Sequence, residues 1–360
     1  MANSAISMYA LSLDQCENAI RLGGNKRTVL VQGHMGTGKS SLLKSLGKAM
    51  PKHVMCYFDC TTKDLGDITI PQLQTIDDQG YVRYVTNEEL GLHLGKDIIL
   101  MVDEYGKANP AVKNAMLRLM LEHHGVHTDS IIFATTNLGA EGVGDLLPPH
   151  ARNRITVLTA RKSTNIEWIE WGINNDVDHT LLGWCKDNPQ LFYSFEDIKN
   201  PDDNPYIFHP QQQRNAFVTP RSLEAASDWL KDRASYDDVS LMALLIGTIG
   251  ERAAMDLNAF VKLADQLPSL ESIKKDPMNA TVPNTAAAVA MVVFRTLTNI
   301  EREWVDAWMD YMNRLDKEAQ GMFANGIRKP KYSRQNIVMT NKKFTAWAMA
   351  NNYLFTADKK

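Results

Sequence analysis

One short segment, residues 33–40, combines three spaced glycines with a lysine and a hydroxyl side chain at its end. It follows the apolar run 28–32 and reads Gly33-His34-Met35-Gly36-Thr37-Gly38-Lys39-Ser40, with Ser41 next. Glycines in such a loop let backbone N–H groups turn toward a phosphate chain, and a following helix points its positive dipole end at the same anion. Lys39 would reach the β- and γ-phosphates, and Ser40 would hold Mg²⁺ with its hydroxyl. The segment therefore predicts a P-loop; a glycine-rich turn that binds no ligand is the alternative.

Acidic and amide side chains follow two further apolar runs. Residues 98–102 lead directly into Asp103 and Glu104, and residues 130–135 are followed closely by Asn137. A buried strand that ends in two carboxylates delivers them to the edge of an α/β sheet where ligands bind. Asp103 would hold Mg²⁺ through its water shell, and Glu104 would orient and polarise the attacking water. Asn137 would contact a γ-phosphate and that water; an ordinary turn asparagine is the alternative.

The elements that must position these residues alternate along the chain. Periodicity, caps and breakers predict helices at 13–22, 40–46, 88–94 and 110–122, and strands at 28–32, 54–58, 98–102, 130–135 and 155–158. We expect the strand at 54–58 to be fully buried, and the helix at 88–94 to begin with a capping box of Thr86 and Glu89. Two β-rich runs, 68–76 and 81–85, predict a hairpin. This alternation predicts an α/β fold whose mostly parallel sheet carries helices on both faces.

The order of these motifs resembles that of the AAA+ ATPases, specifically the MoxR-like branch that includes CbbQ- and NorQ-type activators. The likeness covers about residues 10–260, and its parts are Walker A at 33–40, Walker B at 98–104, sensor 1 at 133–137, the arginine-finger segment at 147–155 and sensor 2 at 218–224. On this alignment Arg154 takes the finger position, Arg152 lies one helical step before it, and Arg221 is the arginine of sensor 2.

The resemblance also implies a domain organisation. Residues 1–160 would form a P-loop three-layer αβα AAA+ core with a pore-facing insert at about 64–85, residues 161–267 a helical lid, and residues 284–360 a helical C-terminal extension. Proline-containing segments between 267 and 283 read as a linker. The chain departs from the family at Tyr105-Gly106, where a pattern like Asp-Glu-Ile-Asn is usual, and in the long polar stretch 188–216.

The activity implied by the resemblance is hydrolysis of ATP with Mg²⁺ in a homo-oligomeric ring, expected to be a hexamer. An arginine finger is useful only if it reaches a γ-phosphate that its own subunit does not hold. The family function would be chaperone-like remodelling or activation of a protein client, in some members with a von Willebrand A-type partner. Two rivals stay open: a nucleic-acid motor or loader similar to McrB-like or helicase-loading proteins, and an ATP-binding scaffold with negligible turnover.

Two further groups of side chains have alternative interpretations. On the hairpin, Ile70, Tyr81 and Tyr84 would either grip a partner or pack against their own domain. The three histidines at 123, 124 and 127 would either bind a metal or cap a helix and contact a subunit.

The C-terminal third is predicted to be helical at 285–296, 300–321 and 341–351. The second of these helices would open with a capping box of Thr298 and Glu301. Its apolar stripe would pack in a core or form a groove for a partner, and consists of Trp304, Trp308, Met312 and Leu315.

Composition and charge set the remaining limits. The chain has 360 residues, 44% of them hydrophobic, and a net charge of −3. Residues 326–360 carry eight basic residues against one acidic residue, a net of +7, which leaves −10 on the residues before them. This basic tail would suit an acidic protein or nucleic acid, or would simply be solvated. The sequence shows no signal peptide and no apolar run long enough for a membrane, and its four cysteines lack metal or disulfide spacing, so we expect a cytoplasmic protein with reduced thiols.

Overall fold

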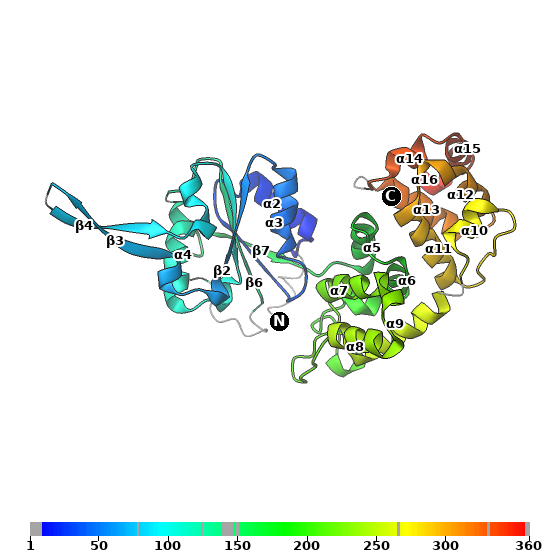
Figure 1. The fold of residues 1–360 in the computed structure, drawn as a ribbon, viewed down its shortest axis with the longest axis horizontal. Coiled ribbons are helices and arrows are strands. Elements are labelled where there is room, and N and C mark those ends of the chain that lie inside the picture. Colours follow the sequence, from blue (N-terminus) through cyan, green and yellow to red (C-terminus); the bar gives the residue numbers. More distant parts are fainter. Residues whose placement is uncertain are drawn as a thin grey trace. The chain divides into compact units, whose positions relative to one another are not determined.

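The computed structural model describes residues 9–77, 79–123, 125–138, 147, 151–264, 267–329 and 332–356. The chain forms two compact units, Met1–Lys162 and Ser163–Lys360. The first unit contains a β-sheet and the second is built from helices (Figure 1). Among the described residues, none of the helices is both long and apolar enough to span a membrane.

A five-stranded parallel sheet forms the centre of the first unit. Its strands are β1 Val29–Gly33, β2 Val54–Asp59, β5 Ile98–Asp103, β6 Ile131–Thr136 and β7 Thr156–Ala160, in the order β2-β5-β6-β1-β7. All pairings between neighbours are parallel. The predicted α/β fold with a parallel sheet is therefore confirmed.

Helices cover both faces of this sheet because its central strands are apolar on both sides. One face packs against α2 Leu13–Gly23 and α3 Ser41–Ala49, which contribute buried residues such as Ile20 and Leu46. The other face packs against α4 Pro110–Glu122, which contributes Val112 and Met116. Figure 1 shows α2 and α3 on one side of the strands and α4 on the other. The first unit is thus a three-layer αβα structure.

The strand at 54–58 is not fully buried, so this part of the prediction was wrong. Cys56 and Phe58 lie in the core, whereas Val54, Met55 and Tyr57 are exposed. The reason is its position, since β2 is an outermost strand of the sheet and has a neighbouring strand on one side only.

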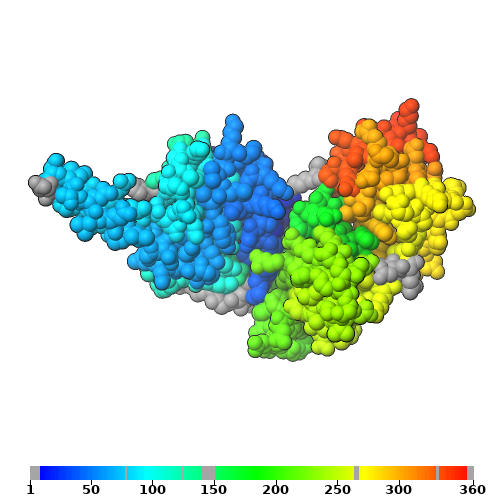
Figure 2. Space-filling view, viewed as in Figure 1, coloured from blue at the N-terminus to red at the C-terminus, as the bar shows by residue number. Residues whose placement is uncertain are grey.

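A two-stranded antiparallel ribbon confirms the predicted hairpin. It consists of β3 Thr69–Ile76 and β4 Gln79–Thr86. The ribbon projects from the first unit, as the ribbon drawing and the space-filling view both show (Figures 1 and 2). Nearly all of its residues are exposed, including Ile70, Tyr81 and Tyr84. None of these three side chains is buried in the core of the first unit.

The segment after the ribbon differs from the predicted helix at 88–94. It forms two single 3₁₀ turns, η3 Glu88–Leu90 and η4 Leu92–Leu94, which are separated by Gly91 at φ +69°. The left-handed glycine interrupts the helix, and the side chain of Asn87, not Thr86, accepts the capping hydrogen bond from the Glu89 amide. Further 3₁₀ turns in the described part of this unit are η1 Cys60–Thr62, η2 Leu65–Asp67 and η5 Tyr105–Lys107.

All regular structure among the described residues of the second unit is helical. Its α-helices are α5 Asn165–Asn174, α6 His179–Asp187, α7 Pro220–Lys231, α8 Asp238–Ile249, α9 Glu251–Ala264, α10 Leu270–Lys275, α11 Ala286–Asn299, α12 Val305–Met312, α13 Lys317–Arg328, α14 Gln335–Met339, α15 Lys342–Ala350 and α16 Tyr353–Thr356. The short 3₁₀ turns are η7 Pro189–Phe192, η8 Pro201–Asp203, η9 Arg233–Ser235 and η10 Arg302–Trp304. One hydrophobic core runs through this unit from Trp168 to Trp347.

The C-terminal helices differ from the prediction in one place. Residues 300–321 do not form one helix, because α12 ends at Met312 and α13 begins after its own cap, Asp316. Thr298 is not a cap; it lies in the last turn of α11, and its hydroxyl donates to the Phe294 carbonyl. The apolar stripe predicted on this segment does pack in the core, since all four of its residues are buried.

The segments on either side of the predicted lid boundary share this core. The predicted linker contains α10, whose Ile273 is completely buried. The polar stretch 188–216 is held by its own contacts: Arg214 donates to the carbonyls of Asn204 and Ile207, at 3.0 and 2.5 Å. The division of residues 161–360 into a lid and an extension stays a prediction.

Candidate nucleotide-binding site

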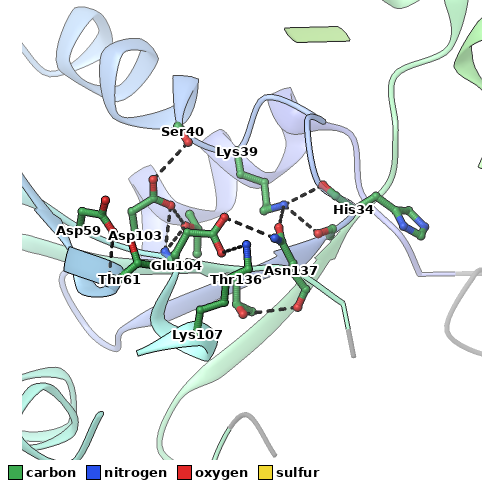
Figure 3. A network of polar contacts seen from close by, with 12 residues as sticks. His34, Lys39, Ser40, Asp59, Thr61, Asp103, Glu104, Lys107, Thr136 and Asn137 are labelled. Atoms are coloured by element: carbon green, nitrogen blue, oxygen red, sulfur yellow. Dashed lines mark hydrogen bonds and ion pairs between the residues drawn. The ribbon is translucent and has the colours of Figure 1, made fainter. Parts of the chain in front are cut away.

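The predicted phosphate-binding loop lies at the switch point of the sheet. From β1 the chain crosses to β2 on one side, whereas from β6 it crosses over β1 to β7 on the other side. Ligands of open α/β folds bind in the crevice at the carboxyl ends of the strands where such connections diverge. The loop after β1 and Asn137 after β6 flank this point. Asp103 is the last residue of the neighbouring strand, β5, and Glu104 follows it. The topology thus brings the predicted residues together, as Figure 3 shows.

Glycine is required at three positions of the loop. Gly36 and Gly38 have φ angles of +70° and +97°, a region that other residues rarely adopt. A Cβ atom on Gly33 would lie 2.7 Å from the carbonyl oxygen of Ala160 on the neighbouring strand. Within the loop, the Thr37 hydroxyl donates to the His34 carbonyl over 3.0 Å. The backbone is therefore a preformed turn between β1 and α3.

Lys39 is buried beneath this loop with its ammonium group fully engaged. Its Nζ donates to the carbonyl oxygens of Gly33 and His34, at 2.7 and 2.8 Å, and to the side-chain Oδ1 of Asn137, at 3.0 Å. Only 6% of Lys39 is exposed. The lysine therefore links the loop after β1 to the end of β6, where a phosphate of a bound nucleotide would add a competing acceptor.

Asp103 accepts hydrogen bonds from hydroxyl groups on three different elements. Ser40 Oγ lies 3.2 Å and Tyr57 Oη 3.0 Å from its Oδ2, and the Thr135 hydroxyl donates to its Oδ1. Hard oxygen ligands of this kind suit Mg²⁺, which is usually held by one or two protein oxygens together with substrate phosphates and water. The pair of Ser40 and Asp103 therefore fits the predicted magnesium site.

Glu104 stands apart in its backbone conformation. Its φ and ψ are +51° and +35°, a left-handed arrangement that is uncommon for a residue with a side chain and that concentrates at functional sites. Its amide donates to Asp103 Oδ1 over 3.1 Å. Its carboxylate Oε1 accepts from Asn137 Nδ2 over 3.4 Å, and Lys107 Nζ lies 3.1 Å from Oε2. Asn137 thus bridges Lys39 and Glu104, as it would in order to contact both a γ-phosphate and the attacking water.

Three residues of this network were not predicted from the sequence, namely Tyr57, Thr135 and Lys107. Tyr57 and Thr135 reach Asp103 because β2 and β6 are the two neighbours of β5. Only the order of the strands in the sheet reveals this, and residue spacing does not. Lys107 carried a local signal, since it follows Glu104 by three residues, the distance at which side chains on a helical turn meet.

Arg154 lies at the other edge of the same sheet. It immediately precedes Ile155 and β7, and Ala160 at the far end of β7 pairs with Gly33 at the start of the loop. The five residues of β7, at about 3.3 Å per step, alone separate Arg154 from that end by about 13 Å. Arg154 is exposed, while Ala151 and Ile155 beside it are buried and fix its position. Arg152 is also exposed, and its Nε donates to the Leu147 carbonyl over 3.0 Å.

Arg221 belongs to the second unit. It is exposed and occupies the first turn of α7, after the cap Thr219 and the first helical residue, Pro220.

The histidines at the end of α4 contact neighbouring polar groups. His123 Nε2 lies 3.0 Å from the Thr28 hydroxyl, and burial lowers the pKa of His123. His127 contacts the Asp97 carboxylate. His124 lies outside the described residues. Within the part of the chain that the structure describes, no group of three or more His, Cys, Asp or Glu side chains could hold a metal ion.

The cysteines do not offer a nucleophile. All four are unpaired and buried. Burial raises the pKa of the Cys16 thiol to about 11, and burial with the nearby carboxylates of Asp59 and Asp103 raises the pKa of Cys60 to about 12. The reactive thiolate is therefore disfavoured at neutral pH.

Comparison with known proteins gives little to add to this geometry. No protein-family model and no curated protein matches the chain. One solved structure to which it is similar is a crystal structure from Cytophaga hutchinsonii described as a "putative ATPase". That match has 14% sequence identity and a TM-score of 0.35, and covers 92% of this chain and 89% of the other. A likeness at this level supports neither a family nor an activity for this chain.

Proposed function

We propose that this chain hydrolyses ATP with magnesium at the switch point of its sheet. The observation that carries the proposal is the convergence of Lys39, Asp103, Glu104 and Asn137 from three strand ends onto the loop after β1. Catalysis of phosphoryl transfer depends mainly on positioning and on neutralising charge, and these side chains supply both. The base of the nucleotide is proposed as adenine on the family resemblance alone.

Each residue has a distinct role in this proposal. Lys39 would bind the β- and γ-phosphate oxygens, and the amides of the loop would surround the phosphate chain. Ser40 and Asp103 would hold Mg²⁺, which would neutralise charge on the phosphates. Glu104 would orient and polarise the attacking water, while Asn137 would contact that water and the γ-phosphate.

We further propose that the active species is a ring of identical subunits, as in the MoxR-like AAA+ proteins that the sequence resembles. The position of Arg154 supports this proposal, because the length of β7 keeps Arg154 away from the loop of its own subunit. A neighbouring subunit would supply the missing guanidinium in a ring. Arg221 is proposed to act from the lid, where it would couple the lid angle to the bound nucleotide.

The proposed substrate of the ring is a protein client, bound in part by the β3–β4 ribbon. Of the 16 residues in its two strands, only Arg83 is charged. The cross-strand pairs Pro71–Tyr84 and Leu73–Val82 share one face, and 83% of Leu73 and 65% of Tyr84 are exposed. An exposed apolar face of this kind marks a surface for protein contact. A von Willebrand A-type partner is a proposal from the resemblance alone.

The nucleic-acid rival depends on the basic tail, and part of that charge is already paired. Lys329 forms an ion pair with Glu170 at 2.6 Å, and Lys343 forms one with Asp310 at 2.7 Å. Lys331, Lys359 and Lys360 lie outside the described residues. The ion pairs reduce the positive charge that a phosphate backbone would meet, so we favour a protein client.

Lys39→Met tests the phosphate-binding role. We expect ATP affinity to fall by about 10- to 100-fold, the usual effect of losing a charged hydrogen bond to a ligand. Equilibrium dialysis with ATP and magnesium measures this, and phosphate release measures the accompanying loss of turnover. Lys44→Met on the exposed side of α3 is the matched control and should bind ATP as the unaltered chain does. A Lys39→Met chain with unchanged affinity would remove the basis of the proposal.

Substitution of the ribbon tests the client. In the double variant Leu73→Ser and Tyr84→Ser, we expect basal hydrolysis to stay within twofold of the unaltered rate. The concentration of a permanently unfolded polypeptide, such as carboxymethylated lactalbumin, that gives half-maximal stimulation should rise by about tenfold, because two apolar contacts are lost. Val239→Ser, at a position that is 79% exposed in α8, is the control. Stimulation by single-stranded DNA alone, falling steeply with salt, would favour the nucleic-acid rival.

A further inference from the structure

The turn that follows Glu104 returns a lysine to its carboxylate. Residues Tyr105–Lys107 form the single 3₁₀ turn η5, in which the Lys107 amide donates to the Glu104 carbonyl over 2.9 Å. Tyr105 is 1% exposed and anchors the turn, since its hydroxyl donates to the Lys113 carbonyl over 3.3 Å. Lys107 Nζ consequently lies 3.1 Å from Glu104 Oε2. Figure 3 draws Lys107 beside this carboxylate.

The two oxygens of the Glu104 carboxylate have unequal partners. Oε1 accepts a long hydrogen bond of 3.4 Å from Asn137, whose amide also serves Lys39. Oε2 is buried from solvent, and its contact with Lys107 is an ion pair rather than a well-aligned hydrogen bond. Lys107 is therefore the charged partner of Glu104, whereas Glu104 shares Asn137 with Lys39.

Binding of a nucleotide would first change the partners of Lys39 and then those of Glu104. Two of the acceptors that Lys39 meets are backbone carbonyls, whereas Asn137 Oδ1 belongs to a side chain that can rotate. A γ-phosphate that takes a hydrogen bond from Lys39 displaces the acceptor that can rotate away, which is Asn137. Its rotation also withdraws Nδ2 from Glu104. Lys107 is then the contact that still holds the Glu104 carboxylate, and its positive charge opposes repulsion between that carboxylate and the phosphate.

We propose that Lys107 is a positioning residue, which holds the Glu104 carboxylate in place for the attacking water while Asn137 changes partners. This role depends on the proposed ATP hydrolysis. Lys107 follows Tyr105-Gly106, the place where the chain departs from the pattern of the AAA+ family that it resembles. The tight 3₁₀ turn at 105–107 brings the Lys107 ammonium group back to Glu104.

Lys107→Met, which keeps most of the length of the side chain and removes its charge, tests the role. We expect kcat to fall by about tenfold, within the range seen when a reacting group shifts by about 1 Å, while KM and the ATP dissociation constant stay within twofold. Lys107→Arg should recover at least a third of the lost rate, because it restores the positive charge. A purely structural lysine would not produce this split between kcat and KM or this recovery.

A second ion pair in the same unit provides the matched control. Lys63 pairs with Glu89 at 2.7 Å, and neither residue belongs to the network around Glu104. Lys63→Met should therefore leave kcat unchanged. A Lys107→Met chain that hydrolyses ATP as fast as, or faster than, the unaltered chain would overturn the positioning role alone. An unaltered chain that binds no ATP or does not hydrolyse it would overturn the proposed function and this role together.

Discussion

Glu104→Gln is expected to lower kcat for ATP hydrolysis by about 10²- to 10³-fold while ATP still binds, as for removal of a catalytic base. Glutamine keeps the shape of the side chain and can still meet Asn137, but it cannot carry the negative charge that polarises water. The left-handed backbone at this position, at φ +51°, is no more difficult for glutamine than for glutamate. The effect should therefore fall on the chemical step and not on the fold. Phosphate release at saturating ATP and equilibrium dialysis of ATP measure the two quantities separately.

The control for this variant is a glutamate of the same unit that lies away from the site. Glu122 at the end of α4 is exposed and pairs with Arg118. Glu122→Gln should hydrolyse ATP at the unaltered rate. If Glu104→Gln did so as well, the carboxylate would have no part in catalysis. A chain that binds ATP tightly and releases no phosphate, even before substitution, would instead match the scaffold alternative.

Sequence patterns predicted that these residues lie together, because they follow one another in continuous segments. The loop at 33–40, the carboxylates after residue 102 and Asn137 each follow an apolar strand, and parallel strands end at one edge of a sheet. Local order was therefore enough to bring them together. The contacts of Tyr57 and Thr135 with Asp103 depend on which strands are neighbours, which spacing along the chain does not contain.

The errors in the predicted fold have a similar origin. An apolar run such as residues 54–58 is typical of a central strand, and only the sheet order places β2 at the outside. The periodicity of 300–321 continues across the break between α12 and α13, so pattern alone did not reveal where one helix ends. Thr86 was predicted to cap a helix, but the neighbouring residue Asn87 accepts the capping hydrogen bond. Thr298 was also predicted to be a cap, but it lies within the preceding helix, α11.

Arg154→Ala is expected to reduce ATP hydrolysis by about 10³-fold or more, the range found for arginines supplied to a γ-phosphate from outside. The physical reason is the developing charge on the phosphate, which in our proposal Lys39 and Mg²⁺ would neutralise from one subunit only. Because the length of β7, about 13 Å, lies between Arg154 and the loop of its own subunit, the loss would arise at the pocket of a neighbour. ATP affinity should change little by comparison. Arg118→Ala, at another exposed arginine of this unit, is the control and should remain active.

Mixing two inactive variants distinguishes action between subunits from action within one. An Arg154→Ala subunit keeps an intact pocket, and a Glu104→Gln subunit keeps an intact Arg154 and still binds ATP, which supports assembly. Where the two meet in a ring, the pocket of the first receives the arginine of the second. We therefore expect the mixture to hydrolyse ATP much faster than the summed rates of the two variants alone. The gain should be proportional to the number of mixed interfaces. If light scattering detects rings in the mixture and the mixture gains no activity, Arg154 does not act across the interface. Full activity of Arg154→Ala alone would mean that it does not act at all.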